Sequence, residues 1–269
     1  MGDLMQAQFG KLGVRVKVKA LTAAEERMPV RVDVQRDALG EYFDVRHAAD
    51  VRVSVLDVTQ HDRHLVLRAR VNAGRNGRRR PHTVDHTFLC GRDERQWFVA
   101  AVPESASAQT VQGAKDALKP RAVWDSIRAH NVPLEQRDLR KNDAFVRQGE
   151  WFFLPRPDLR VDRKLVLKRE PIQRGAGKPH WCWWLYREGG ESVYVSRRYP
   201  NGLTPAEYEA LTSKQRRRDW RLMTRDARVF AKGAISHVDH KTIWLPCWHE
   251  VVLNRESEAQ SMRHVAFLD

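Results

Sequence analysis

The amino-acid sequence predicts an α+β protein, predominantly β, built from two small domains. Short segments with β-branched or aromatic residues at every second position recur along both halves of the chain. Helical spacing of apolar residues is limited to a few short segments. A polar, proline-containing segment, 131–143, lies between the two halves. We therefore place the domains at 1–143 and 144–269.

The first domain is expected to be a β-meander, either a small barrel or a curved sheet, followed by helices. Between two of its strands, the residues 72–81 include Gly, Asn and Pro and predict a turn. Two helices are expected over 106–118 and 122–130, where apolar residues recur at helical spacing. The expected strands share an alternating apolar pattern and cover 13–19, 30–34, 41–46, 51–58, 64–71, 87–90 and 96–102.

The second domain is expected to be a β-rich module with one helix. That helix has a clear start: Thr204 is the N-cap, Pro205 takes the first helical position and Glu207 completes a capping box. We expect it to end near Lys214. The expected strands of this domain cover 146–155, 164–168, 181–187 and 192–196, followed by a β-hairpin over 233–256.

Composition narrows the choice of partners. The 269 residues carry a net charge of +14 and a pI near 10.1, which favours polyanions and above all nucleic acid. The N-terminus has no signal-peptide pattern, and no apolar run is long enough for a membrane span. The three cysteines are far apart, which argues against a disulfide framework. We therefore expect a cytoplasmic protein without a membrane partner.

The predicted hairpin carries a cluster of chemically active side chains. His237 and His240 have H-x-x-H spacing, and Cys247 and His249 are two residues apart, so they share one face of a strand. With His180, these residues predict a metal site, and zinc is the ion that suits such N and S ligands. The alternative is structural: histidines hydrogen-bonded to backbone and Cys247 buried as a small apolar residue.

A catalytic role for this cluster remains open. Asp239, His240, His249 and Asn254 partly match an HNH nuclease motif, but their order and the strand pattern around Asn254 do not fit it. A histidine acting as general base in a hydrolase stays open, because imidazole titrates near neutral pH. No catalytic residue is assigned from the sequence.

Nucleic-acid binding is indicated by basic clusters and by aromatic residues next to basic ones. Bases stack on aromatic side chains, while Arg and Lys neutralise phosphates. In the segment W-C-W-W, 181–184, we expect at least one face to be core and at most one tryptophan to stack on a base. The candidate nucleic-acid residues are Arg75, Arg78, Arg79, Arg80, Lys178, Trp181, Arg216, Arg217, Arg218 and Arg221.

The second half also resembles a group of small, β-rich bacterial proteins of uncharacterised function, over about 146–256. Their pattern has an R-Q-G-(D/E) start, a glycine-rich turn leading to a His, an H-x-(E/D)-H motif and an I-x-L-P strand. One His follows the turn here, where those proteins often have two. The resemblance implies no activity. The matching residues are Arg147, Gln148, Gly149, Glu150, Gly177, His180, His237, Asp239, His240, Ile243, Leu245 and Pro246.

The sequence therefore predicts a bacterial, cytoplasmic protein with a non-enzymatic accessory role, which binds mainly the phosphate backbone of nucleic acid. A metal-dependent hydrolase or nuclease that uses the His/Cys cluster is the first alternative. A protein–protein adaptor within a larger complex is the second.

Overall fold

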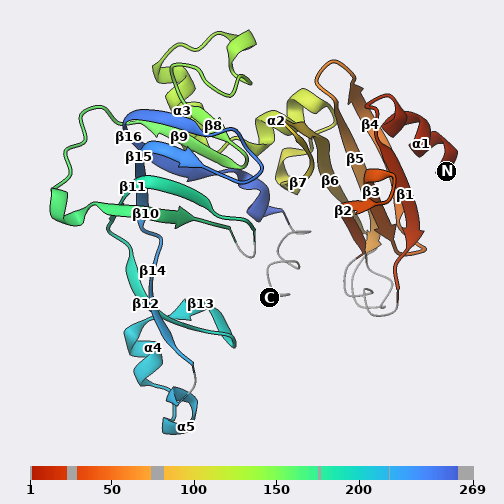
Figure 1. Cartoon of the computed structure of the whole chain (residues 1–269). Coiled ribbons are helices and arrows are strands. Elements are labelled where there is room, and N and C mark those ends of the chain that lie inside the picture. The colour runs from red at the N-terminus through yellow and green to blue at the C-terminus, as the bar shows by residue number, and fades with distance from the viewer. Residues whose placement is uncertain (1, 23–28, 74–81, 175–176, 218, 260–269) are drawn as a thin grey trace.

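The computed structural model describes residues 2–22, 29–73, 82–174, 177–217 and 219–259. Strands dominate and several short helices accompany them, which confirms the predicted α+β, predominantly β class (Figure 1). Within the described residues, no helix is long and apolar enough to cross a membrane.

The first half contains two sheets packed face to face. One has the order β1-β3-β2 and the other is a meander, β4-β5-β6-β7. A shared core joins them, with Phe43 of the first sheet and Leu65, Leu67 and Trp97 of the second. The strands are β1 (Arg15–Ala20), β2 (Val30–Asp37), β3 (Gly40–His47), β4 (Arg52–Thr59), β5 (His64–Ala73), β6 (His82–Asp93) and β7 (Gln96–Val102).

This arrangement corrects two details of the expected meander. The described strands form no closed barrel, because the four-stranded sheet ends at β4 and β7. β1 runs parallel to β3, so the chain does not follow a simple up-and-down path there. The helix α1 (Gly2–Gly10), which the sequence analysis did not predict, packs beside β1 and β4 and adds Phe9 to the core.

Alternation along β5 explains why the four-stranded sheet is covered on both faces. Leu65 and Leu67 point into the core between the sheets, whereas Val66 points to the opposite face. There it meets α2 (Val111–Leu118) through Ala114 and Leu118. This helix starts later than expected, because the Thr110 side chain caps it by accepting the Gly113 N–H; η2 (Glu104–Ala106) precedes it.

The second half is organised by one six-stranded antiparallel sheet of order β10-β11-β15-β16-β9-β8. The predicted hairpin is confirmed as the β15–β16 pair. The strand expected over 164–168 was misplaced, because η4 (Arg163–Leu165) precedes β10. The strands are β8 (Val146–Gln148), β9 (Trp151–Pro155), β10 (Leu167–Ile172), β11 (His180–Glu188), β15 (Arg228–Ser236) and β16 (Ile243–Leu253).

Successive residues of β9 support two separate cores. Phe153 is fully buried on the inner face, together with Leu185 and Ile235. Phe152 points to the other face and packs with Ile127 of α3 (Arg121–Ala129). The helix α3, which we had placed in the first domain, thus shares its core with the second sheet. A short η3 (Leu134–Gln136) follows it.

A small subdomain, residues 189–227, is inserted between β11 and β15. The β11–β15 ladder continues as a β12–β14 ladder, and the insertion projects away from the sheet (Figure 1). At the junction Gly190 has φ +88°, and a Cβ there would lie 2.6 Å from the Thr224 side chain. Its elements are β12 (Glu191–Ser196), β13 (Tyr199–Leu203), α4 (Pro205–Glu209), α5 (Ser213–Arg216) and β14 (Arg221–Arg225).

The predicted start of α4 is confirmed in detail. Thr204 and Glu207 form the capping box, and Pro205 lies at the first helical position. The expected extension to Lys214 is wrong, because the helix ends at Glu209. A second capping box at Thr212 and Gln215 then starts α5.

The C-terminal part of the second half returns to the first. Following β16, η5 (Arg255–Glu258) packs against β7 and α2. The buried Glu256 carboxylate accepts hydrogen bonds from the Ala101 N–H, at 3.3 Å, and from the Arg174 guanidinium, at 2.5 Å. One side chain therefore joins both sheets.

We predict that Glu256→Ala lowers the free energy of unfolding by about 1–3 kcal/mol, because it leaves a buried N–H and a guanidinium without their acceptor. Urea unfolding measures the change. The control is Glu258→Ala. The half-exposed Glu258 carboxylate pairs with Arg255 in the same turn, so this substitution should change the free energy of unfolding by less than about 0.5 kcal/mol. Equal effects of both variants would contradict this role for Glu256.

Candidate metal centre

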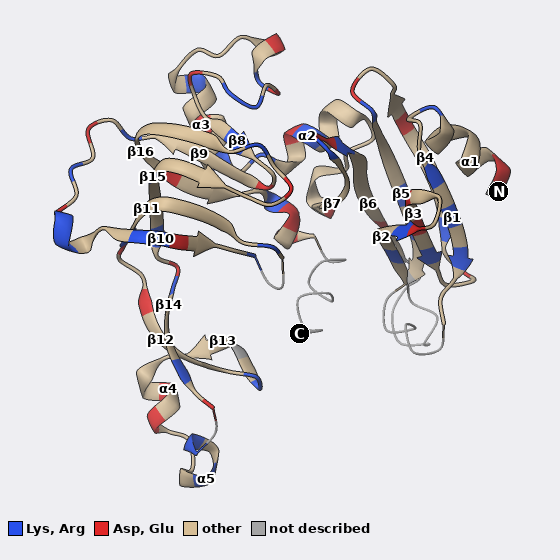
Figure 2. Ribbon diagram, viewed as in Figure 1, with Lys and Arg blue, Asp and Glu red and all other residues tan. Residues whose placement is uncertain are grey.

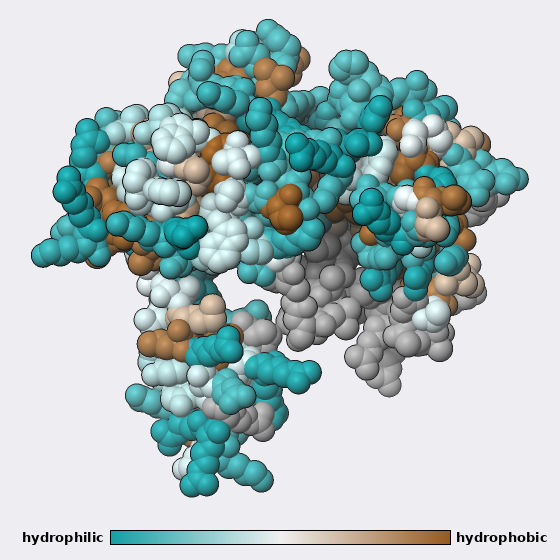
Figure 3. All heavy atoms as spheres, in the orientation of Figure 1, coloured by the Kyte–Doolittle hydropathy of each residue, from teal (hydrophilic) through white to brown (hydrophobic). Residues whose placement is uncertain are grey.

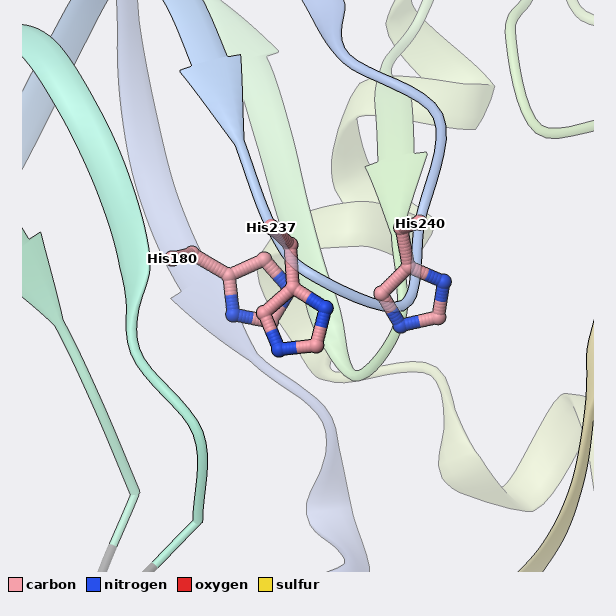
Figure 4. A group of neighbouring side chains, drawn as sticks. All are labelled: His180, His237 and His240. Carbon is pink, nitrogen blue, oxygen red and sulfur yellow. The ribbon is translucent and has the colours of Figure 1, made fainter.

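Three histidines from separate segments meet at one end of the six-stranded sheet (Figure 4). His180 is the first residue of β11, and His237 directly follows β15. Trp181 pairs with Ser236 in the antiparallel ladder. The next pair along this ladder would therefore set His180 opposite His237. His240 comes from the loop that leads into β16.

The three rings are close and nearly parallel. The centroids of His180 and His237 are 4.1 Å apart at an interplanar angle of 20°, and those of His237 and His240 are 4.8 Å apart at 30°. One nitrogen of each ring lies within 4.8 Å of the other two. Three nitrogens that share a zinc ion lie about 3.3 Å apart, so the stacked rings would have to turn toward a common point to complete the site.

Burial leaves polar atoms of this cluster without hydrogen bonds. His180 is only 1% exposed, and neither of its ring nitrogens has a partner among the described residues. The Nδ1 atom of His240 and the Nε1 atom of the adjoining Trp151 are in the same situation. A buried imidazole without any partner costs free energy, so the cluster has the character of a site that a ligand completes.

The turn between β8 and β9 closes over the histidines. Gly149 has φ +58°, and a Cβ there would lie 3.0 Å from Nε2 of His240 and 3.4 Å from Nε2 of His180. The buried Gln148 amide donates a hydrogen bond to the Lys241 carbonyl at 2.8 Å and so fixes the loop that carries His240. Both Nε2 atoms therefore converge on a position where only glycine leaves them room.

Electrostatics keep the rings in the form that binds metal. Burial lowers the pKa of His180 to about 3, assisted by the neighbouring His237 and His240. The pKa values of His237 and His240 are also lowered, first by burial, while the Glu150 carboxylate opposes both shifts. The three imidazoles are thus neutral at pH 7, as metal ligation requires.

The first half of the chain supplies the carboxylate behind His240. Glu94, in the β6–β7 turn, has an oxygen 3.7 Å from Nδ1 of His240, and it accepts the Lys241 N–H at 2.7 Å. The Arg140 guanidinium holds the same carboxylate. Glu94 has φ +51°, a strained value for a non-glycine residue. At 3.7 Å the contact is not a hydrogen bond, but it places the carboxylate on the outer side of His240, where the second-sphere partner of a metal ligand usually lies.

His237 has a different environment. Its Nδ1 accepts the Asp239 N–H at 3.1 Å, and the Asp239 carboxylate pairs with Lys178 at 2.7 Å. A metal ion on His237 therefore competes with a local hydrogen bond. His237 is also less buried than His180.

Among the five residues expected to form the metal site, the structure brings His180, His237 and His240 together and leaves Cys247 and His249 apart. His249 is buried in β16, opposite Ala231, and its Nδ1 lies 2.9 Å from the Cys247 carbonyl. The Cys247 sulfur contacts the same ring at 3.8 Å. The contact of His249 with a backbone carbonyl is the one that the structural alternative describes, whereas Cys247 is only partly buried and not fully buried as that alternative expects.

The candidate nucleic-acid residues that the structure describes do not form one surface. Basic side chains are spread over both halves and the insertion (Figure 2). Arg216 and Arg217 lie at the exposed end of the insertion, and Arg221 begins β14. Lys178 and the exposed Trp181 flank the histidines instead. The residues Arg75, Arg78, Arg79, Arg80 and Arg218 lie outside the described part of the chain.

Several residues of the site were not singled out as functional in the sequence. The sequence marks Gly149 and Gln148 only through the resemblance, and it does not mark Glu94. No local pattern marks Glu94, because its role depends on contact between the halves. Trp183 was considered within W-C-W-W but not chosen, whereas exposed Trp244 was missed as a candidate.

Comparison of the chain with family models, curated proteins and solved structures finds no match. The resemblance of 146–256 to small β-rich proteins therefore stays an expectation.

We predict that the metal-free protein loses stability as the pH falls from about 6.5 to about 3. The folded state keeps His180 neutral down to about pH 3, whereas the unfolded chain takes up this proton near pH 6.5, so acid favours unfolding. Urea unfolding in chelator at several pH values measures how the free energy of unfolding changes with pH. His180→Phe should make this dependence on pH weaker, and an unchanged dependence would show that His180 is not its source.

Proposed function

We propose that the protein binds one divalent transition-metal ion through His180, His237 and His240, and that this ion activates water for hydrolysis. The observation that carries the proposal is the buried His180 ring, which has no hydrogen-bond partner among the described residues and lies beside two further imidazoles. Zinc is the best-suited ion, because neutral imidazoles are among its preferred ligands.

The number of ligands favours catalysis over a purely structural role. Structural zinc sites have four protein ligands, whereas catalytic sites have three and keep a position for water. Three histidines would supply three ligands here, and Cys247 and His249, the other expected ligands, lie elsewhere on β16. A zinc ion held by these histidines would lower the pKa of a water molecule to about 7 and so supply hydroxide at neutral pH.

Glu150 is our candidate for the general base. It follows Gly149 in the turn over the histidines, is half-buried, and its charge acts on the pKa of both His237 and His240. Glu94 and Asp239 are less suited to this role because cations already hold them, Arg140 for Glu94 and Lys178 for Asp239.

We predict that the purified protein holds about one zinc ion per chain and that His180→Ala and His240→Ala each lose it. Elemental analysis and competition with a chromogenic chelator measure content and affinity. The matched controls are His249→Ala and Cys247→Ser, which should keep the metal. Loss of metal in these controls, or its retention in His240→Ala, would contradict the three-histidine site.

We predict that Glu150→Gln keeps the metal but lowers hydrolysis of bis(p-nitrophenyl) phosphate and p-nitrophenyl acetate by about 10²–10⁴-fold. The control is Glu135→Gln, an exposed residue in η3. Full activity of metal-loaded Glu150→Gln would exclude Glu150 as the base. A metal-loaded wild type that hydrolyses neither ester nor nucleic acid would contradict the hydrolytic role and leave the metal site itself standing.

A further inference from the structure

Three tryptophans stand exposed on the outer face of the six-stranded sheet. Trp181 is 48% exposed, Trp183 51% and Trp244 65%. They belong to β11 and β16, and Cys182 between the first two is fully buried on the inner face. Single exposed apolar residues are common, but a group of neighbouring indoles on one face marks a contact surface.

Strand register places Trp181 and Trp244 on the same face of the sheet, on either side of β15. On β15, which lies between β11 and β16, Ser236 pairs with Trp181 and Ala234 pairs with Trp244. Directly opposed residues point to the same face, so Trp181 and Trp244 flank a floor of two small side chains. We call Trp181, Trp183 and Trp244, with Ala234 and Ser236 between them, the tryptophan platform.

A bulge in the ladder brings Trp183 to the same surface. The register of β11 against β15 shifts between Cys182 and Trp184, opposite Gly233. Gly233 has φ +85°, and a Cβ there would lie 3.2 Å from Cβ of Trp183 and 3.1 Å from the ring of Trp184. The rings of Trp183 and Trp184 then meet edge to face, with centroids 6.4 Å apart. Glycine at this position thus allows adjacent indoles to crowd over β15.

Lysines border the platform. Lys168 of β10 and Lys232 of β15 pair with Trp184 from either side, so the three side chains form one row across three strands. Neither lysine has an ion-pair partner within the described residues, whereas Lys178 is neutralised by Asp239. In Figure 3, pale, weakly polar side chains lie over the six-stranded sheet, with strongly hydrophilic residues around them. The surface therefore offers flat aromatic rings with positive charge beside them.

We propose that the tryptophan platform binds single-stranded nucleic acid, with bases stacked on the indoles and phosphates next to Lys168 and Lys232. Unpaired bases expose the flat faces that indoles stack on, whereas a duplex hides them. The net charge of +14 favours a polyanion over a neutral protein partner. The proposal is independent of the metal centre, since His180 points to the inner face and Trp181 to the outer one.

The test is fluorescence anisotropy of a labelled oligothymidylate of about 15 nucleotides, with the full chain in chelator. Trp181→Ala and Trp244→Ala should each weaken binding about tenfold, and Trp244→Phe should restore most of it, because a phenyl ring still stacks. Lys232→Gln should lower the slope of log affinity against log salt by about 0.7. Thermal melting checks that each variant is folded, and the exposure of Trp244 makes it the safest site.

Matched controls separate the platform from other basic and functional groups. Arg216→Gln lies in α5, at the end of the insertion, and should leave the affinity for oligothymidylate within about twofold if the platform provides the stacking contacts. His240→Ala should bind as the wild type does, even if it loses metal, so a failure of the metal proposal remains distinguishable.

Four results would overturn the proposal. The first is unchanged affinity in the Trp181→Ala and Trp244→Ala variants. The second is equally tight binding of a duplex. The third is loss of binding in Arg216→Gln alone. The fourth is that the tryptophan substitutions weaken binding to phosphatidylserine vesicles but not to oligothymidylate, which would make the platform a membrane-contact surface.

Discussion

The antiparallel ladder between β11 and β15 is the interaction on which both proposed functional surfaces depend. It sets His180 opposite His237 on the inner side and Trp181 beside Ser236 on the outer side. Because successive residues of a strand point to opposite faces, a metal ligand and a platform indole can be chain neighbours without touching. A one-residue slip of this ladder would exchange the two faces and destroy both sites at once.

The ladder also explains the unusual burial of His180. Its partner on the other side, Ile172 of β10, belongs to the inner core, so the imidazole is held at the edge of an apolar layer. Burial keeps the ring neutral and deprives it of water, and the Gly149 turn closes over it. A protein that used this position only for packing would be expected to place an apolar residue there, since such a residue carries no unpaired polar atoms.

The candidate metal centre lies where the halves of the chain meet. The three histidines come from the second half, while Asp93 at the end of β6 and Glu94 in the β6–β7 turn come from the first half and are held by Arg140. Glu256 makes a second connection between the sheets, through Ala101 and Arg174. The first half therefore contributes to the electrostatics around the three histidines although it supplies none of them, and this connects its fold to the proposed chemistry.

Local sequence determined the elements whose causes are local. Alternating residues predicted most strands, including the β15–β16 hairpin, and Thr204, Pro205 and Glu207 predicted the start of α4 down to its hydrogen bonds. These features depend on neighbours in the chain, so a single sequence reveals them. The end of α4 was not predicted. A second capping box at Thr212 starts a separate helix, α5, where one continuous helix was expected.

Tertiary structure alone decided which of the candidate residues meet. The sequence proposed five ligands. Strand register sets His180 opposite His237, the loop before β16 adds His240, and His249 lies further along β16, opposite Ala231. The contribution of Glu94, the absence of a closed barrel among the described strands and the exposure of Trp244 also depend on pairing between distant segments. Spacing along the chain carries no information on such pairing, because it is fixed by hydrogen bonds and burial that form only when the sheet assembles.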